Sequence, residues 1–144
     1  MFKKLKRNII KMFREILIYH NKSLEFRAKI LTLIVAIDDQ INACKDKKLR
    51  EVAAKVYADD NTRADLLVDT VHEYCLKIQT NNGLDLEHLI LLVEREAKEN
   101  KRYTKKINIE RLKEFEECLT NEDDKIFHQR VIEYLRVMKE EYGE

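Results

Sequence analysis

Two aspartate–histidine pairs are the residues of this chain whose types and spacing could do chemistry. Asp69 and His72 stand three residues apart, and so do Asp85 and His88. On a helix this spacing places both side chains on one face, as in the ligand helices of di-iron bundles. Such a centre also needs carboxylates from further helices and a Glu-x-x-His motif, which the chain lacks. We therefore expect surface histidines and keep a metal-binding bundle, enzyme or sensor, as an alternative.

The cysteines and the single serine predict no other catalytic centre. Cys44, Cys75 and Cys118 are far apart and form no CxxC pair, so together with four histidines they give no zinc spacing. A Cys–His nucleophile stays open, although nothing distinguishes Cys75 from Cys44. Ser23 suits a helix cap better than a nucleophile, and no glycine-rich phosphate loop is present. We expect reduced thiols, no enzymatic activity and a cytoplasmic protein.

The composition predicts an all-α fold. The chain has 144 residues, of which 44% are hydrophobic and 38% charged, with no proline and two glycines, Gly83 and Gly143. Sheet folds need many tight turns, and the residues that make them are scarce here. The formal net charge of +1 indicates no polyanionic partner. We expect a compact bundle of about seven helices.

The stretch Phe26–Ile41 is the most apolar part of the sequence and should form the centre of the bundle. Phe26, Ile30 and Ile34 recur at helical spacing, and apolar residues also flank this stripe. An interruption is expected within residues 38–43. The chain carries no uninterrupted apolar run of the length of a membrane span.

Residues 2–20 predict a basic amphipathic helix, so we divide the chain into that helix, residues 1–22, and a single helical domain, 23–144. Lys3, Lys4, Arg7 and Lys11 lie mostly off its apolar stripe and are the expected partner-binding residues. The ordinary expectation is that the stripe packs on the core and the lysines face water. A basic amphipathic helix can instead enter a groove of a protein partner, or lie on an anionic membrane through residues 1–20.

Turn and cap signals place the remaining helices near residues 45–57, 62–79, 86–97, 109–119 and 121–142. We expect the helix 62–79 to end in a turn where Gly83 adopts a positive φ. The helices on either side of this turn should then pair antiparallel. The expected N-terminal caps are Ser23, Thr62, Asp85, Asn108 and Thr120. The basic run around Tyr103 lacks interleaved aromatic residues, so a nucleic-acid partner is not expected. An oligomer stays open.

Two stretches resemble the repeat of the TerB-like (tellurite-resistance) domain. They are LTLIVAIDDQINACKDKKLREVA, residues 31–53, and ECLTNEDDKIFHQRVIEYLRVMKEEYGE, residues 117–144. Each resembles an apolar helix followed by an acidic loop and the start of a new helix. The resemblance spans roughly residues 24–144 and implies an all-helical domain with internal pseudo-symmetry. It also implies a role in stress response and protein interaction, and divalent metal binding at the acidic loops.

The acidic loops depart from the family pattern. Asp38 matches the family aspartate, but Asp39 replaces the glycine, and in the second stretch Tyr142 stands where an aspartate belongs. The resemblance makes Asp38, Asp39, Glu141 and Glu144 the candidate divalent-metal ligands, with plain helix-end acids as the expected alternative. Our leading hypothesis is a non-enzymatic protein-interaction module of TerB-like type. Its partner-binding features are the Asp38–Asp39 loop and the basic N-terminal residues.

Overall fold

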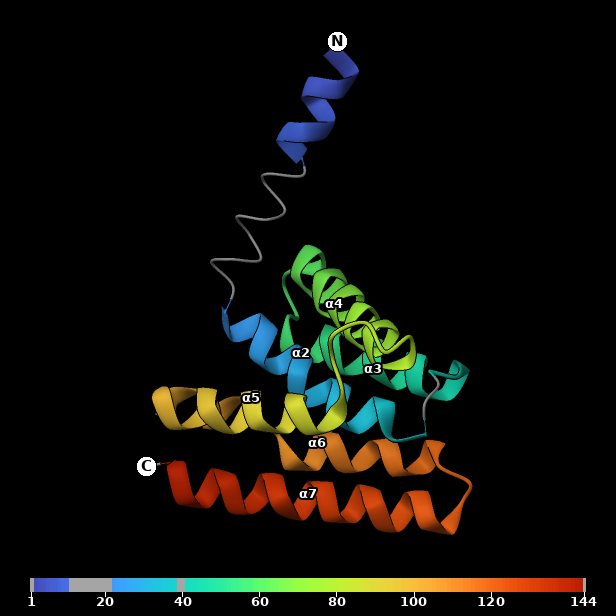
Figure 1. Ribbon diagram of the computed structural model, residues 1–144, viewed down its shortest axis with the longest axis vertical. Helices are drawn as coiled ribbons and strands as arrows, with labels where there is room; N and C mark the ends of the chain where they lie inside the picture. Colours follow the sequence, from blue (N-terminus) through green and yellow to red (C-terminus); the bar gives the residue numbers. More distant parts are fainter. Residues whose placement is uncertain (1, 11–21, 39–40, 144) are drawn as a thin grey trace.

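The computed structural model describes residues 2–10, 22–38 and 41–143. Every regular element in these ranges is a helix (Figure 1), which confirms the all-α prediction. The elements in chain order are the N-terminal helix (residues 2–10), α2 (Lys22–Val35), the 3-10 helix η1 (Ala36–Asp38), α3 (Ala43–Val56), α4 (Asn61–Gln79), α5 (Leu86–Glu99), η2 (Lys101–Lys106), α6 (Ile109–Lys113), η3 (Glu114–Cys118) and α7 (Glu122–Tyr142).

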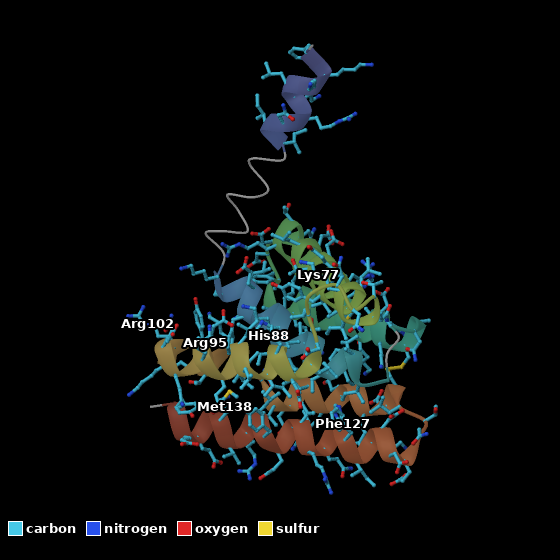
Figure 2. All side chains as sticks on the ribbon, viewed as in Figure 1. Lys77, His88, Arg95, Arg102, Phe127 and Met138 are labelled. Atoms are coloured by element: carbon cyan, nitrogen blue, oxygen red, sulfur yellow. A yellow bond between two sulfur atoms is a disulfide. The ribbon has the colours of Figure 1, made fainter. Side chains whose placement is uncertain are left out.

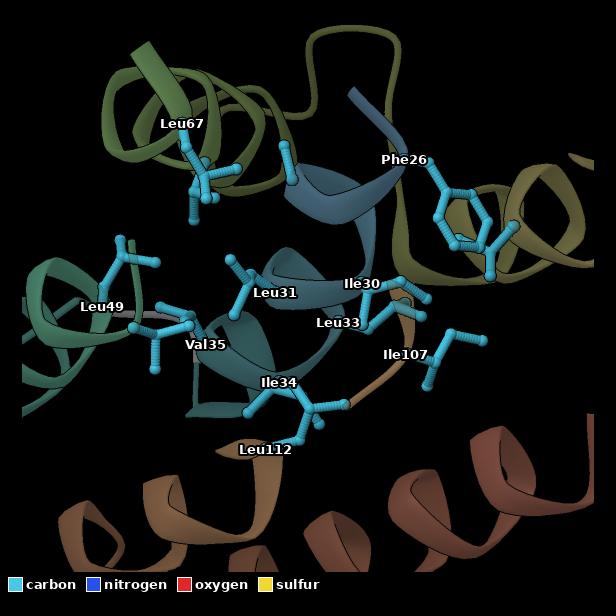
Figure 3. Packing of buried hydrophobic residues seen from close by; sticks show 14 of the residues in the cluster. Phe26, Ile30, Leu31, Leu33, Ile34, Val35, Leu49, Leu67, Ile107 and Leu112 are labelled. Carbon is cyan, nitrogen blue, oxygen red and sulfur yellow. The ribbon is translucent and has the colours of Figure 1, made fainter. Parts of the chain in front are cut away.

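Helix α2 is the centre of the fold, as the sequence predicts. Nine of its fourteen residues are buried, so it has almost no solvent face. Figure 1 shows α2 running between α3 and α4 on one side and α5, α6 and α7 on the other. Leu49 approaches it from α3, Leu67 from α4 and Ile107 from the link between η2 and α6 (Figure 3). From Ile30 to Val35 the helix is buried on every side, which is typical of the core of a multi-helix domain.

Helices α4 and α5 do not pair along their lengths, so the expected antiparallel hairpin is wrong. Each packs mainly against α2, which offers apolar surface to both. Helix α4 does end in the predicted turn, in which Gly83 adopts a φ of 86°. Asn81 also lies in the left-handed region, with a φ of 57°. The chain therefore reverses in the expected place but leads α5 to a different partner.

The expected helix starts are correct for two helices and displaced for others. Asp85 caps α5 and Asn108 caps α6, while the predicted helix 109–119 is divided into α6 and η3. Ser23 is not a cap, because α2 already begins at Lys22. The interruption after α2 is confirmed, and Asn42 caps α3. The other displaced caps are Asp60 instead of Thr62 for α4 and Asn121 instead of Thr120 for α7.

The buried face of α7 differs from the one its aromatic residues suggest. The apolar pattern of the sequence favours an inner stripe of Phe127, Val131, Tyr134, Leu135, Met138 and Tyr142. Val131, Leu135 and Met138 are buried as expected, but Phe127 and Tyr134 are exposed. His128, one position after Phe127, is buried in its place and shares the core-facing stripe with Val131 and Leu135. Five residues share this face and are buried: His128, Val131, Ile132, Leu135 and Met138.

Candidate functional site

The N-terminal helix exposes its apolar side chains to solvent. The exposed fraction is 77% for Phe2, 58% for Leu5, 56% for Ile9 and 49% for Ile10. For residues 2–10 the expectation that this stripe packs on the core is therefore wrong. Figure 2 shows the side chains of this helix standing clear of the domain. Three of the predicted partner-binding cations, Lys3, Lys4 and Arg7, are exposed beside the apolar residues, and Lys11 lies outside the described residues.

Within the described residues, the N-terminal helix lacks the packing partner that would stabilise it. A helix of so few residues is marginal in water when its apolar face has nothing to pack against. The sequence continues the same stripe with Met12, Phe13 and Ile16, and adds the cations Lys11 and Arg14. Contiguous exposed apolar residues beside basic ones are typical of surfaces that bind a membrane or another protein. The N-terminal helix is therefore the strongest candidate interaction surface.

The acidic metal set implied by the family resemblance is described only in part. Asp39 and Glu144 lie outside the described residues, and Asp38 is the last residue of η1. Glu141 is exposed in the last turn of α7. Figure 1 places the C-terminal end of α7 and the end of η1 at opposite sides of the molecule. The two helix ends that carry Asp38 and Glu141 therefore lie apart, and the metal set stays a prediction.

The two aspartate–histidine pairs do not form a joint centre either. The Asp85 carboxylate accepts a hydrogen bond from the backbone N–H of His88 at 2.7 Å, so it serves as a helix cap. His72 Nε2 lies 2.8 Å from Asp46 Oδ1 in α3, rather than pointing at Asp69 or at α5. In the described ranges no three His, Cys, Asp or Glu side chains gather closely enough to hold a metal ion.

The Asp46 carboxylate contacts Arg50 on its own helix, α3, and links α3 to α4 through His72. This carboxylate accepts from Arg50 Nε at 3.0 Å on its own helix and lies against His72 on the next one. The Arg50 guanidinium, and after it the His72 imidazole, lower the pKa of the Asp46 carboxyl. An ionised Asp46 stabilises the contact between the two helices. This explains the position of His72 without a ligand.

Two of the three cysteines are joined, so the expectation of three reduced thiols is wrong. Cys44 in the first turn of α3 forms a disulfide with Cys118 at the end of η3, with Cα atoms 5.5 Å apart. No CxxC motif marks this bond, because its partners are 74 positions apart in sequence. Cys75 stays a free thiol inside the core, where burial raises its pKa to about 11. A thiol of this kind is a poor nucleophile at neutral pH.

Two ionisable residues that the sequence did not single out are buried in the core. Lys45 is 1% exposed, and its Nζ donates to the carbonyl of Val35, the last residue of α2, at 2.8 Å. His128 is also 1% exposed, and among the described residues neither ring nitrogen has a hydrogen-bond partner. Burial, and to a smaller extent Lys45, lowers the pKa of His128, while Glu116 acts in the opposite direction. The spacing of His128 to Val131 and Leu135 could have predicted its burial; no comparable signal marks Lys45.

The basic run near Tyr103 does not present an aromatic platform. The Tyr103 ring is half-buried and lies 5.0 Å from the ring of Phe26, centroid to centroid. Lys101, Arg102 and Lys105 are exposed around it. Because base stacking needs a free ring face, this segment lacks the usual combination for single-stranded nucleic acid.

Comparison with family models, with curated proteins and with solved structures finds no match to this chain. Within residues 2–10, 22–38 and 41–143, none of the helices combines the length and the apolar character needed to cross a bilayer.

Proposed function

We propose that this protein is a non-enzymatic interaction module that attaches to an anionic membrane surface through its N-terminal helix. The exposure of Phe2, Leu5 and Ile9 on one short helix carries the proposal. Lys3, Lys4 and Arg7 lie on the same helix. The domain that begins with α2 would then be held at the membrane and left free to bind a protein partner.

The energetics favour a lipid surface over water for this helix. Burying a Leu, Ile or Phe side chain that was exposed contributes about 1.5–3 kcal/mol. Each Lys or Arg close to an anionic leaflet adds about 1 kcal/mol. The N-terminal helix has four exposed apolar residues and also Lys3, Lys4, Lys6 and Arg7. Both contributions act together when the helix lies in the interface with its apolar face down.

The candidate catalytic groups support a non-enzymatic role. Asp85 serves as a cap, His72 binds Asp46, and the Cys75 thiol is buried with a raised pKa. The resemblance of residues 31–53 and 117–144 to the TerB-like domain would give the helical domain a role in stress response and protein interaction. The all-α fold is compatible with that origin. A cytoplasmic location was expected in part from three reduced thiols, and the Cys44–Cys118 bond removes that support.

Sedimentation with lipid vesicles tests the proposal. The full chain is mixed with vesicles of phosphatidylcholine alone or with added phosphatidylserine, at low and at high salt. We expect sedimentation only with the anionic vesicles, and weaker binding at high salt because exposed charges are screened. Absence of binding to anionic vesicles at low salt would overturn the membrane role.

Two sets of substitutions separate the apolar face from the charges. Reversing Lys3, Lys4 and Arg7 to glutamate should weaken binding at least about a hundredfold, because each cation contributes about 1 kcal/mol. Leu5→Asp with Ile9→Asp should abolish insertion while keeping every cation. The matched control reverses three exposed lysines of the domain, Lys47, Lys55 and Lys105, and should retain most of the binding. An equal loss in that control would indicate unspecific charge attraction.

A further inference from the structure

A narrow pocket enters the core of the domain between α2, α3, α4 and α6. Its volume is about 30 Å³. The floor is made entirely of aliphatic side chains, four of which appear in Figure 3: Ile30, Leu31, Leu67 and Leu112. Val52 and Val56 of α3 complete the floor. No floor residue can donate or accept a side-chain hydrogen bond, so the inner part of the pocket suits hydrocarbon.

Three cationic side chains line the same pocket: Arg27 from α2, Lys106 from the end of η2 and Arg111 from α6. We call this the cationic pocket. Within the described part of the chain, none of the three lies within ion-pair distance of a carboxylate. The Arg27 guanidinium lies over the Tyr57 ring, 5.3 Å from its centroid, and the Arg111 backbone N–H donates to Asn108 Oδ1.

This concentration of positive charge is unusual for a chain that is otherwise balanced. Carboxylates are as plentiful as cations, 27 against 28, and many neighbouring cations do pair. Lys29, two residues from Arg27, binds Glu96 at 2.8 Å, and Lys113, two residues from Arg111, lies 3.5 Å from Glu110. Burial and the nearby Arg27 lower the pKa of Lys106, and no carboxylate acts against them. A bound anion would relieve this repulsion.

The geometry points to a binding site for a short-chain aliphatic carboxylate in the cationic pocket. The carboxylate would contact Arg27, Lys106 and Arg111, and the hydrocarbon end would enter the aliphatic floor. Arginine guanidinium groups bind carboxylates with paired hydrogen bonds, and a lysine adds a point charge. A volume of about 30 Å³ is close to the space of one water molecule in the liquid, so only the terminal carbon atoms of the chain enter the cavity, the rest of the chain and the carboxylate lie at its open mouth, and no ring system or nucleotide fits. The site is on the domain and is independent of the N-terminal helix.

Titration of the full-length protein with hexanoate tests the assignment by calorimetry. We expect saturable binding that is at least about tenfold tighter than that of 1-hexanol, which lacks the charge, and of acetate, which lacks the chain. Equal binding of hexanol would overturn the role of the cations, and equal binding of acetate would overturn that of the floor. N-acetylleucine presents the carboxylate as a peptide terminus does. Markedly tighter binding of N-acetylleucine than of hexanoate would overturn the assignment to a simple aliphatic carboxylate, because it would indicate a site for a peptide C-terminus.

Single substitutions locate the site. Arg111→Gln and Lys106→Gln should each weaken hexanoate binding about tenfold, because each removes one charge-assisted contact. Arg95→Gln is the matched control, since Arg95 is exposed on α5 and does not line the pocket. Unchanged affinity in both pocket variants would overturn the site.

A measurement on the unaltered chain guards against variants that fail to fold. Acylation of individual lysines is followed by mass spectrometry with and without hexanoate. Hexanoate should protect Lys106 but not the exposed Lys47 or Lys105, and hexanol should protect none of them. Equal protection of all three lysines, or none at Lys106 at saturating hexanoate, would overturn the proposal.

Discussion

At the scale of single residues, the two ionisable side chains buried in the described core differ in their hydrogen-bond partners. Lys45 donates to the terminal carbonyl of α2, where a cation is favoured by the helix dipole. His128 lies on the buried face of α7 with both ring nitrogens unpaired. A buried polar group without a partner costs about 1–3 kcal/mol. His128 is therefore the position where an apolar residue should improve the fold.

We predict that His128→Leu stabilises the protein, and more so in acid. At about pH 7 the gain should be about 1–3 kcal/mol, because leucine leaves no orphaned nitrogen. Burial lowers the pKa of His128 in the folded state below its ordinary 6.5. As the pH falls through and below that ordinary value, the unfolded chain binds the proton first, so wild-type stability decreases by up to about 1.4 kcal/mol per pH unit. The variant lacks this decrease.

Urea unfolding at about pH 7, 6 and 5 measures both effects. Comparison with the variant cancels the titration of all other groups, including Glu116 and Lys45, which also act on His128. His88→Leu is the control, because His88 is exposed. If wild type and His128→Leu lose stability in parallel between pH 7 and 5, the buried imidazole is not the cause.

At the scale of elements, asparagine and aspartate caps set where the helices begin. Each α-helix from α3 to α7 follows such a residue, whose side chain accepts from a backbone N–H near the start of the helix. Caps of this kind contribute about 1 kcal/mol each. Because the chain has no proline, these caps are the main local signals for where its helices begin. The five capping residues are Asn42, Asp60, Asp85, Asn108 and Asn121.

The start of α4 provides the sharpest test of this view. Asp60→Ala should destabilise the protein by about 1 kcal/mol, because Asp60 Oδ1 accepts from the backbone N–H of Arg63 at 3.0 Å. Asp60→Asn should retain most of the stability. Asp59→Ala and Thr62→Ala are the controls, and both should stay within about 0.5 kcal/mol of wild type in urea unfolding. A larger cost for Thr62→Ala than for Asp60→Ala would restore the cap expected from the sequence.

Local sequence patterns predict some features of this fold and not others. Hydrophobic periodicity predicted the helices and the central position of α2, because apolar spacing is a local property. The cap of α4 was displaced because Asp59, Asp60, Asn61 and Thr62 all suit that role. The buried stripe of α7 was predicted correctly at Val131, Leu135 and Met138 but wrongly at Phe127 and Tyr134, because large aromatic residues outweighed a histidine. The disulfide and the cationic pocket depend on which helices meet, and local pattern carries no such information.

At the scale of the whole molecule, one covalent bond joins two elements of the helical domain that are far apart in sequence. α3 follows the central helix, and η3 precedes α7, yet the Cys44–Cys118 bond joins them (Figure 2). The elements in between include both sides of the core around α2. Cross-linking residues this far apart removes conformational freedom from the unfolded chain, and the effect grows with the length of the closed loop.

We predict that reducing this bond lowers the free energy of unfolding by about 2–4 kcal/mol without changing the helical fold. Urea unfolding followed by circular dichroism, with and without a thiol reductant, measures the difference. Cys44→Ser should match the reduced wild type and show no further response to reductant. Cys44 is the better position to alter, because it is exposed, whereas serine at the buried Cys118 would add a hydroxyl to the core. Equal stability of oxidised and reduced protein would show that the domain is held by its core alone.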